Sequence, residues 1–128
     1  MLRILVIDDE TMLLDVLTLL LNKFGYHVET ATNGKEGIQK FDTGRFDLII
    51  TDMRMPGIDG KSVVRHIRNS AQSFIPIIGI SGTPWLLEDS GCDLVISKPF
   101  PLKVLIDSIK NLAAILFKKH PHPRGEDR

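Results

Sequence analysis

The sequence predicts an α/β fold in which a doubly wound parallel sheet of five strands carries helices on both faces. Short apolar runs of strand length alternate along the chain with longer segments whose apolar residues recur at helical spacing, a pattern typical of parallel sheets. Three of the runs are predominantly apolar, as strands buried on both faces are. The chain has 128 residues, 43% of them hydrophobic, which is enough for one domain with its own core.

The first half of the chain contains three of the strands. The first apolar run ends at Asp8-Asp9, and the leucine-rich helical segment after it stops at Gly25, a residue type common just past a helix end. A more polar strand follows, and then Asn33 and Glu36 fit the N-cap and capping-box pair of a short helix. In this half we expect strands over 2–7, 26–31 and 46–51, and helices over 10–24 and 33–44.

The second half continues the alternation and sets the strand order. A loop rich in glycine and proline, residues 55–60, leads into a helix, and a proline-containing tail without apolar periodicity follows the last helix. The second strand carries His27, Glu29 and Thr30, which indicates an edge position and the order 2-1-3-4-5 of a flavodoxin-like fold. In this half we expect helices over 61–70 and 102–117, and strands over 76–80 and 93–97.

Composition and charge argue against several classes of protein. Sixteen basic residues balance sixteen acidic ones, which argues against bulk attraction to nucleic acid or to an anionic membrane. The charge is nevertheless uneven, with a net −4 over residues 1–60 and +4 over residues 61–128. The single cysteine, Cys92, suits a reducing compartment, and the chain shows neither a membrane-spanning run nor a signal-peptide pattern. We therefore expect a cytoplasmic protein.

Polar side chains follow four of the five expected strands. Asp8-Asp9 end the first strand, Asp52 the third, Ser81 the fourth, and Lys98 comes directly after the fifth. In open parallel sheets the ligand crevice lies outside the carboxyl ends of the strands, where the strand order reverses. The sequence therefore predicts that three carboxylates, a hydroxyl and an ammonium group converge at this edge of the sheet.

Such a cluster has the parts needed for phosphoryl transfer. The carboxylates, with Glu10 beside them, repel one another, so the cluster either holds protons tightly or binds a cation, and oxygen ligands favour Mg²⁺. An aspartate can act as nucleophile and hold an acyl phosphate, whose charge a metal ion and a lysine would neutralise. Each residue also has a local alternative: an N-cap for Asp8 or Asp9, a turn cap for Asp52, a strand-end hydroxyl for Ser81, and a solvated ammonium for Lys98.

These motifs resemble the receiver domain of bacterial two-component response regulators over residues 2–117. The resemblance rests on Asp8-Asp9, the segment from Asp52 to Gly60, Ser81-Gly82 and Lys98-Pro99-Phe100. It implies that Asp52 accepts a phosphoryl group from a phosphohistidine in a phosphorelay. It also implies that Asp9, Asp52 and the backbone carbonyl of Arg54 ligate Mg²⁺ (or Mn²⁺), with Asp8 acting mainly through a metal-bound water.

The resemblance assigns the remaining polar residues to the phosphoryl group. Ser81 would donate a hydrogen bond to it and Lys98 would pair with it, while the Lys98-Pro99 bond is cis in such proteins. It implies a stoichiometric phosphoacceptor, not an enzyme with turnover, although the domain catalyses its own phosphotransfer and dephosphorylation. A phosphatase of the aspartate-nucleophile class is disfavoured because Arg54 stands where its second aspartate would be.

Two departures from the family pattern concern the output of the signal. The family usually has an aromatic residue three positions before the lysine, where this chain has Val95. The connection after Ser81 is also short, so the helix between the fourth and fifth strands, beginning at Thr83-Pro84, is shortened to about two turns at most. We therefore expect the signal to leave through rearrangement of a switch region made of Gly82, Thr83, Trp85 and Val95.

The expected partners are a sensor histidine kinase or phosphotransfer protein and an unidentified downstream protein, with no nucleic acid and no membrane. A wide apolar stripe on the last helix leaves a homodimer open. Residues 1–117 form the expected receiver domain, and residues 118–128 form a flexible tail or the start of a linker. The alternative reading is a degenerate receiver that acts only as a protein-interaction module.

Overall fold

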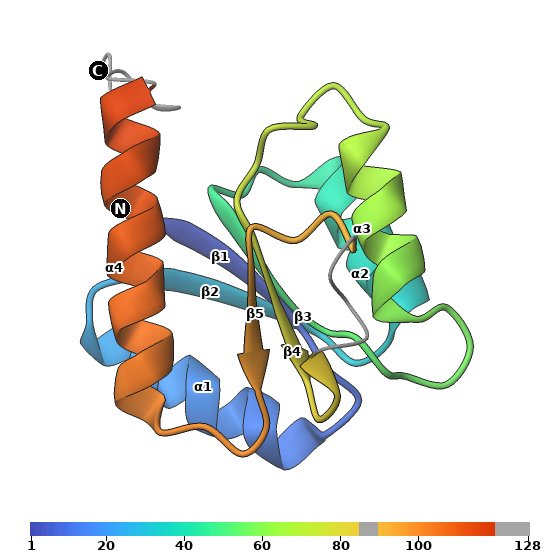
Figure 1. The fold of residues 1–128 in the computed structure, drawn as a ribbon, viewed down its shortest axis with the longest axis horizontal. Helices are drawn as coiled ribbons and strands as arrows, with labels where there is room; N and C mark the ends of the chain where they lie inside the picture. Colours follow the sequence, from blue (N-terminus) through green and yellow to red (C-terminus); the bar gives the residue numbers. More distant parts are fainter. Residues whose placement is uncertain (85–89, 120–128) are drawn as a thin grey trace. The chain divides into compact units, whose positions relative to one another are not determined.

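The computed structural model describes residues 1–84 and 90–119, the last four of them through their backbone alone. The chain divides into two compact units, Met1–Lys98 and Pro99–Arg128. Over their described residues, the first unit contains the sheet and three α-helices, and the second contains one α-helix (Figure 1). Among the described residues, no helix is both long enough and apolar enough to cross a membrane.

The first unit is a parallel sheet in the order β2-β1-β3-β4-β5, as predicted. Helix α1 lies on one face of the sheet, and α2 and α3 lie together on the other (Figure 1). Because all strands run in parallel, their carboxyl ends meet at one edge. Its elements are β1 (Arg3–Ile7), α1 (Thr11–Lys23), β2 (His27–Ala31), α2 (Gly34–Thr43), β3 (Leu48–Asp52), α3 (Gly60–Arg68), β4 (Ile77–Ser81) and β5 (Leu94–Ser97).

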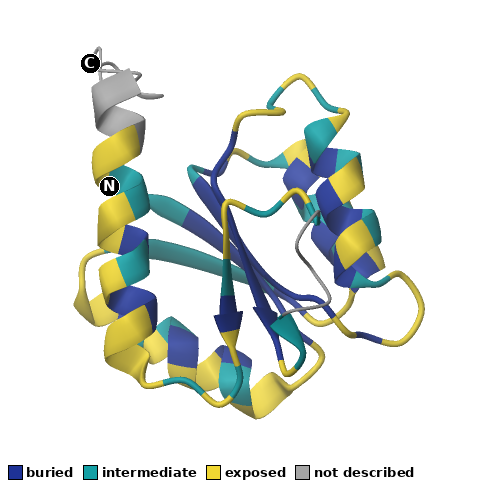
Figure 2. Ribbon diagram, viewed as in Figure 1, coloured by how far each residue is buried: buried dark blue, intermediate teal, exposed yellow. Residues whose placement is uncertain are grey.

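Burial along the strands explains their order. The strands β1, β3 and β4 are buried almost throughout, whereas β2 is half-buried over its first four residues and β5 has a single buried residue, Ile96 (Figure 2). The polar edge predicted for the second strand is therefore confirmed. The core under α2 and α3 contains Leu5, Ile7, Ala31, Phe41, Phe46, Ile49, Met53, Met55, Val63, Val64, Ile67, Ile75 and Ile77.

The local signals at the helix ends act largely as expected. Gly25 follows α1 with a φ of +85°, a conformation that favours glycine. The side chain of Asn33 accepts a hydrogen bond from the Glu36 backbone N–H, as an N-cap does. The returning bond differs from the usual capping box, because Glu36 accepts from the backbone N–H of Thr32 rather than from that of Asn33. The helix start was thus predicted correctly, with the donor of the returning bond shifted by one residue, from Asn33 to Thr32.

Arg68 ties α3 to the chain on both sides of β4. Its guanidinium donates to the carbonyl oxygens of Ser73 and Ile75, both at 2.7 Å, and to that of Gly91 at 2.9 Å. It also forms an ion pair with Asp93, whose carboxylate accepts the backbone N–H of the first residue of β4. The end of the β4–β5 connection is therefore held against α3 by side-chain hydrogen bonds.

The connection between β4 and β5 is described only over residues 82–84 and 90–93, where the structure contains no α-helix. The expected short helix and Trp85 lie mainly in the segment 85–89, outside the described residues. In the second unit, α4 (Leu102–Lys119) runs two residues past the expected helix end at residue 117. An ion pair between Lys103 and Asp107, one turn apart, supports its first turns.

Candidate functional site

Three carboxylates meet at the carboxyl edge of the sheet. Asp8 and Asp9 follow β1, Asp52 ends β3, and each offers an oxygen that lies within 4.8 Å of one from each of the other two. Asp8 and Asp52 are buried, with 1% and 5% of their surface exposed, whereas Asp9 is exposed. The predicted convergence of these residues is confirmed, and the arrangement offers oxygen ligands to a small hard cation from one open side.

Asp8 is a buried acid with a raised pKa. Burial raises its pKa to about 6, although the hydrogen bond from the Glu10 backbone N–H to Asp8 Oδ1, at 2.8 Å, acts in the opposite direction. Its other oxygen, Oδ2, is buried and has no hydrogen-bond partner among the described residues. An unpartnered buried carboxylate oxygen is costly unless a cation compensates it, so the donor set fits a divalent metal ion.

Lys98 supplies the positive charge of the site. Its backbone N–H donates to the Ser81 carbonyl at 2.8 Å, which extends the β4–β5 pairing by one residue. Its Nζ lies 3.3 Å from Asp52 Oδ2 and 3.9 Å from Asp8 Oδ2. Burial opposes the charged form, but the attraction of the two carboxylates prevails and raises the pKa of the ammonium group. The solvated alternative for Lys98 is therefore wrong.

The structure excludes the local role suggested for Asp8 and Asp9 and supports the one suggested for Asp52. Neither Asp8 nor Asp9 caps α1, because Glu10 occupies the N-cap position and makes no side-chain cap bond. Asp52 does accept a hydrogen bond from the Arg54 backbone N–H, at 3.3 Å, so it also stabilises the turn after β3. This turn bond involves Oδ1 and leaves Oδ2 facing Lys98.

Glu10 was predicted to lie in the acidic cluster, but its contact with Lys98 was not predicted. Its Oε1 lies 3.3 Å from Lys98 Nζ, the same distance as that between Lys98 and Asp52. The sequence signal was weak, because the partner is 88 residues away and the Glu10 side chain is 64% exposed. The structure thus shows that this fourth carboxylate contacts Lys98 at the outer side of the site.

Ser81 is buried at the end of β4 and interacts with the start of the next segment. Its Oγ accepts a hydrogen bond from the Thr83 backbone N–H at 3.0 Å and lies 3.4 Å from Thr83 Oγ1. Gly82 is exposed, and Val95 is half-buried against the core. The part of the switch region that the structure describes therefore includes a direct contact between Thr83 and the predicted phosphoryl-binding hydroxyl.

The loop after Asp52 is packed closely onto the site. A Cβ at Gly60 would lie 2.5 Å from both the Asp52 carbonyl oxygen and the Met53 Cα, which are backbone atoms that cannot move aside. Asp59 caps α3 by accepting the Ser62 backbone N–H at 3.0 Å. The first turn of α3 is thereby fixed against the strand that carries the phosphoacceptor candidate.

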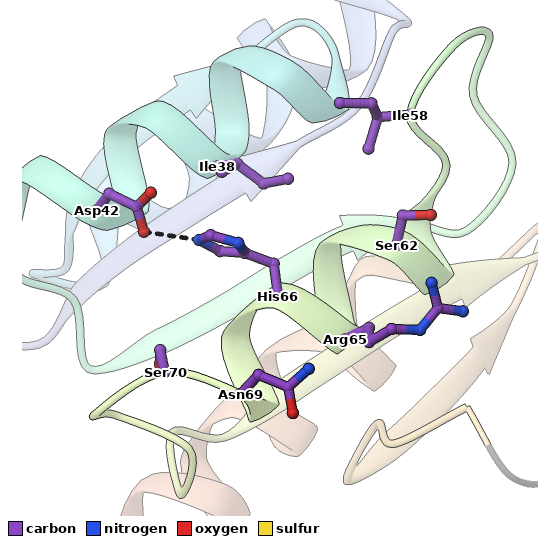
Figure 3. Close-up of a pocket in the computed structure, with 8 residues that line it drawn as sticks. All are labelled: Ile38, Asp42, Ile58, Ser62, Arg65, His66, Asn69 and Ser70. Atoms are coloured by element: carbon purple, nitrogen blue, oxygen red, sulfur yellow. Dashed lines mark hydrogen bonds and ion pairs between the residues drawn. The ribbon is translucent and has the colours of Figure 1, made fainter.

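A separate groove of about 480 Å³ lies between α2 and α3 (Figure 3). The hydrogen bond between His66 Nε2 and Asp42 Oδ1, 2.7 Å long, bridges the two helices at one end, and the His66 ring meets Phe41 edge-on. Ile38 and Ile58 line its apolar side. None of its lining residues belongs to the acidic cluster, so the groove is distinct from the site at the carboxyl edge.

Comparisons with known proteins agree with the sheet and the acidic edge. The family model described as the response regulator receiver domain matches residues 4–110. The chain belongs to the response regulator receiver domain family. In this receiver domain, the acidic pocket of Asp8, Asp9 and Asp52 is consistent with a phosphoacceptor site, and a degenerate receiver is the less favoured interpretation.

Two relatives of this chain are much longer than the chain itself. This chain is 30% identical over 115 residues to the transcriptional regulatory protein TrcR of Mycobacterium tuberculosis. The match covers 86% of this chain and 44% of TrcR. The chain is 35% identical over 114 residues to the CAI-1 autoinducer sensor kinase/phosphatase CqsS of Vibrio cholerae, covering 84% of this chain and 17% of that protein. The chain therefore spans less than half the length of these two relatives.

Solved structures resemble the receiver domain over nearly their whole length. The response regulator TrrA of Thermotoga maritima, in complex with Mg²⁺-BeF, is 36% identical, with a TM-score of 0.80 over 88% of this chain and 99% of that one. A CheY-like receiver domain protein of Methanospirillum hungatei is 26% identical, with a TM-score of 0.85 over 93% and 98% of the two chains. Receiver domains are not classical enzymes, and as a family they interact with sensor kinases and downstream effectors.

Proposed function

We propose that this receiver domain is the phosphoacceptor of a two-component phosphorelay and that Asp52 accepts the phosphoryl group. The observation that carries the proposal is the contact of Lys98 with Asp52 Oδ2 at 3.3 Å, beside two further carboxylates within 4.8 Å. In the reaction, the Asp52 carboxylate attacks the phosphorus of a phosphohistidine, the P–N bond breaks, and the imidazole leaves with the electron pair.

Asp8, Asp9, Asp52 and the backbone carbonyl of Arg54 would hold a divalent cation, Mg²⁺ or Mn²⁺. Such an ion neutralises charge on the phosphoryl oxygens when it is bound. The unpartnered Oδ2 of Asp8 supports this ligand set, because a cation would compensate it. The Mg²⁺-BeF complex of the related TrrA also supports Mg²⁺ as the ion.

The remaining residues stabilise the phosphoryl group on Asp52. Lys98 lies on the Oδ2 side of that carboxylate, where its ammonium can pair with the transferred group. The Ser81 Oγ accepts the Thr83 backbone N–H, and its own hydroxyl proton can be donated to a phosphoryl oxygen. The cis form of the Lys98-Pro99 bond stays a prediction. These residues would also make phosphotransfer and dephosphorylation self-catalysed.

We assign residues 1–117 to the phosphoacceptor domain and residues 118–128 to a tail or linker. The partners are a sensor histidine kinase or phosphotransfer protein and an unidentified downstream protein. Rearrangement of the switch region of Gly82, Thr83, Trp85 and Val95 would carry the signal. Light scattering before and after phosphorylation tests the homodimer, since a mass that stays that of one chain in both states contradicts it.

Intact-mass measurement with acetyl phosphate tests the phosphoacceptor. We expect wild type with Mg²⁺ to gain the mass of one phosphoryl group, and the gain to be lost with a chelator or in Asp52→Asn. Asp15→Asn is the matched control, because it makes the same change at an exposed position on α1. An adduct that persists in Asp52→Asn, or no adduct in wild type, would overturn the proposal.

A further inference from the structure

Glu10 shares the ammonium group of Lys98 with the proposed phosphoacceptor. Lys98 Nζ lies 3.3 Å from Glu10 Oε1 and 3.3 Å from Asp52 Oδ2. The two carboxylates differ in exposure, because the side chain of Glu10 is 64% exposed and that of Asp52 only 6%. Glu10 is therefore the partner of Lys98 that an incoming ligand meets from the solvent side.

Glu10 also lies outside the group of acids that can hold a metal ion. Within the described residues that group consists of Asp8, Asp9 and Asp52. A divalent cation there would compensate the negative charge of Asp8 and Asp52, the other two carboxylates near Lys98. Glu10 would then be the one carboxylate at Lys98 whose charge the cation does not compensate directly.

The side chain of Glu10 is not needed to start α1. Glu10 occupies the N-cap position, but its carboxylate makes no cap hydrogen bond. The local contact to Asp8 comes from the Glu10 backbone N–H, which any residue other than proline supplies. A substitution of the carboxylate therefore leaves the helix start and the Asp8 contact in place.

We propose that Glu10 is a specificity-determining residue: its carboxylate competes with an incoming phosphoryl group for Lys98 and disfavours small phosphodonors of high negative charge. This inference rests on the proposed function. A phosphohistidine on a protein brings a docking surface whose contacts offset the local repulsion. A free anionic phosphodonor has no such contacts, so it meets the full effect of the Glu10 charge.

Two small phosphodonors differ in charge at about pH 7.5 and report on this effect. Acetyl phosphate is a dianion, and its reaction forms the bond between an Asp52 oxygen and phosphorus while acetate leaves with the electron pair of the broken P–O bond. Phosphoramidate carries a net single negative charge, because its nitrogen is protonated. Its P–N bond breaks and ammonia leaves with that electron pair.

Coulomb's law sets the size of the effect. For charges about 7 to 10 Å apart in water, removing one negative charge accelerates the approach of a monoanion about two- to threefold and that of a dianion about four- to eightfold. Salt screens such an interaction over about 10 Å at 0.1 M, so the acceleration falls as the ionic strength rises.

The test compares the second-order phosphorylation rates of wild type, Glu10→Gln and Asp15→Asn with both donors and Mg²⁺. We expect Glu10→Gln to react about four- to eightfold faster with acetyl phosphate and about two- to threefold faster with phosphoramidate. Asp15→Asn, which removes one exposed charge from the same end of the chain, should match wild type with both donors.

Several results would overturn the inference. Unchanged rates in Glu10→Gln would show that the carboxylate does not restrain Lys98, and slower rates would show that it assists by holding Lys98 in place. Equal acceleration with both donors, or the same acceleration in Asp15→Asn, would exclude a local charge effect. Wild type that forms no adduct with either donor refutes the proposed function itself, whereas an Asp52-dependent adduct with unchanged Glu10→Gln rates refutes this inference alone.

Discussion

Replacing Asp8 by asparagine should stabilise the metal-free protein at neutral pH. Asp8 is 1% exposed, and burial raises its pKa from 3.8 to about 6. A carboxyl group whose pKa rises on folding by that amount destabilises the folded state by about 3 kcal/mol once it is ionised in both states. Asparagine removes the charge while its Oδ1 can still accept the backbone N–H of Glu10.

The pH dependence of this gain has a definite sign. The folded protein binds the Asp8 proton more tightly than the unfolded chain does, so Asp8 costs no stability below its unfolded pKa of 3.8. The cost grows as the pH rises through that value and is complete above about 6. The advantage of Asp8→Asn should therefore be about 1 to 3 kcal/mol at about pH 7.5 and no more than about 0.5 kcal/mol at about pH 4.

Urea unfolding of wild type, Asp8→Asn and Asp15→Asn at these two pH values measures the effect. Asp15 is an exposed carboxylate of α1, so its substitution controls for the change in net charge. Mg²⁺ should reduce the advantage of Asp8→Asn, because the ion stabilises the folded wild type by binding to it. Equal stability of Asp8→Asn and wild type at pH 7.5, or an equal advantage at both pH values, would refute the reasoning.

Three further predictions concern the binding of Mg²⁺, the β4–β5 connection and the loop after Asp52. Calorimetry should find Mg²⁺ binding weaker at about pH 5 than at pH 7.5, because below about 6 the proton on Asp8 competes with the ion; affinity independent of pH would contradict this. Arg68→Ala should lower the free energy of unfolding in urea by about 2 to 4 kcal/mol, because it removes three hydrogen bonds to carbonyl oxygens and the ion pair with Asp93. A loss no larger than that of Arg45→Ala, an exposed arginine, would argue against the network. Gly60→Ala should cost about 2 kcal/mol or more and weaken Mg²⁺ binding, because its Cβ meets backbone atoms at 2.5 Å; unchanged stability and binding would show that the loop adapts freely.

The strand order of the sheet could be predicted from the sequence, because the burial of each strand is reflected in how apolar its residues are. Predominantly apolar runs identified the central strands, and the polar residues His27, Glu29 and Thr30 identified an edge. Once the order is known, parallel strands place their ends at one edge, so the meeting of Asp8, Asp52 and the other site residues follows from topology. Strand and helix ends were correct within one or two residues.

Contacts that depend on packing or on long side chains could not be predicted. Adjacent residues such as Asp8 and Asp9 lie on different sides of the chain, but the pattern does not say which one becomes buried. The contact between Glu10 and Lys98 joins residues 88 positions apart through flexible side chains, whose rotamers no local spacing encodes. The hydrogen bonds of Arg68 could not be predicted either, because most of their acceptors are backbone carbonyl oxygens, which every residue has and no sequence pattern marks.

The negative and the positive groups of the site are attached to strands that differ in how many neighbouring strands they pair with. The carboxylates extend from β1 and β3, each paired on both sides, whereas Lys98 follows the four-residue edge strand β5, which pairs with β4 alone. Edge strands open locally at lower free energy than central ones, so β5 can detach while the rest of the sheet stays folded. Each such opening would withdraw the ammonium group and leave the acids without it. Amide hydrogen exchange in β5 would thus measure how often the site loses the positive charge of Lys98 while the rest of the domain stays folded.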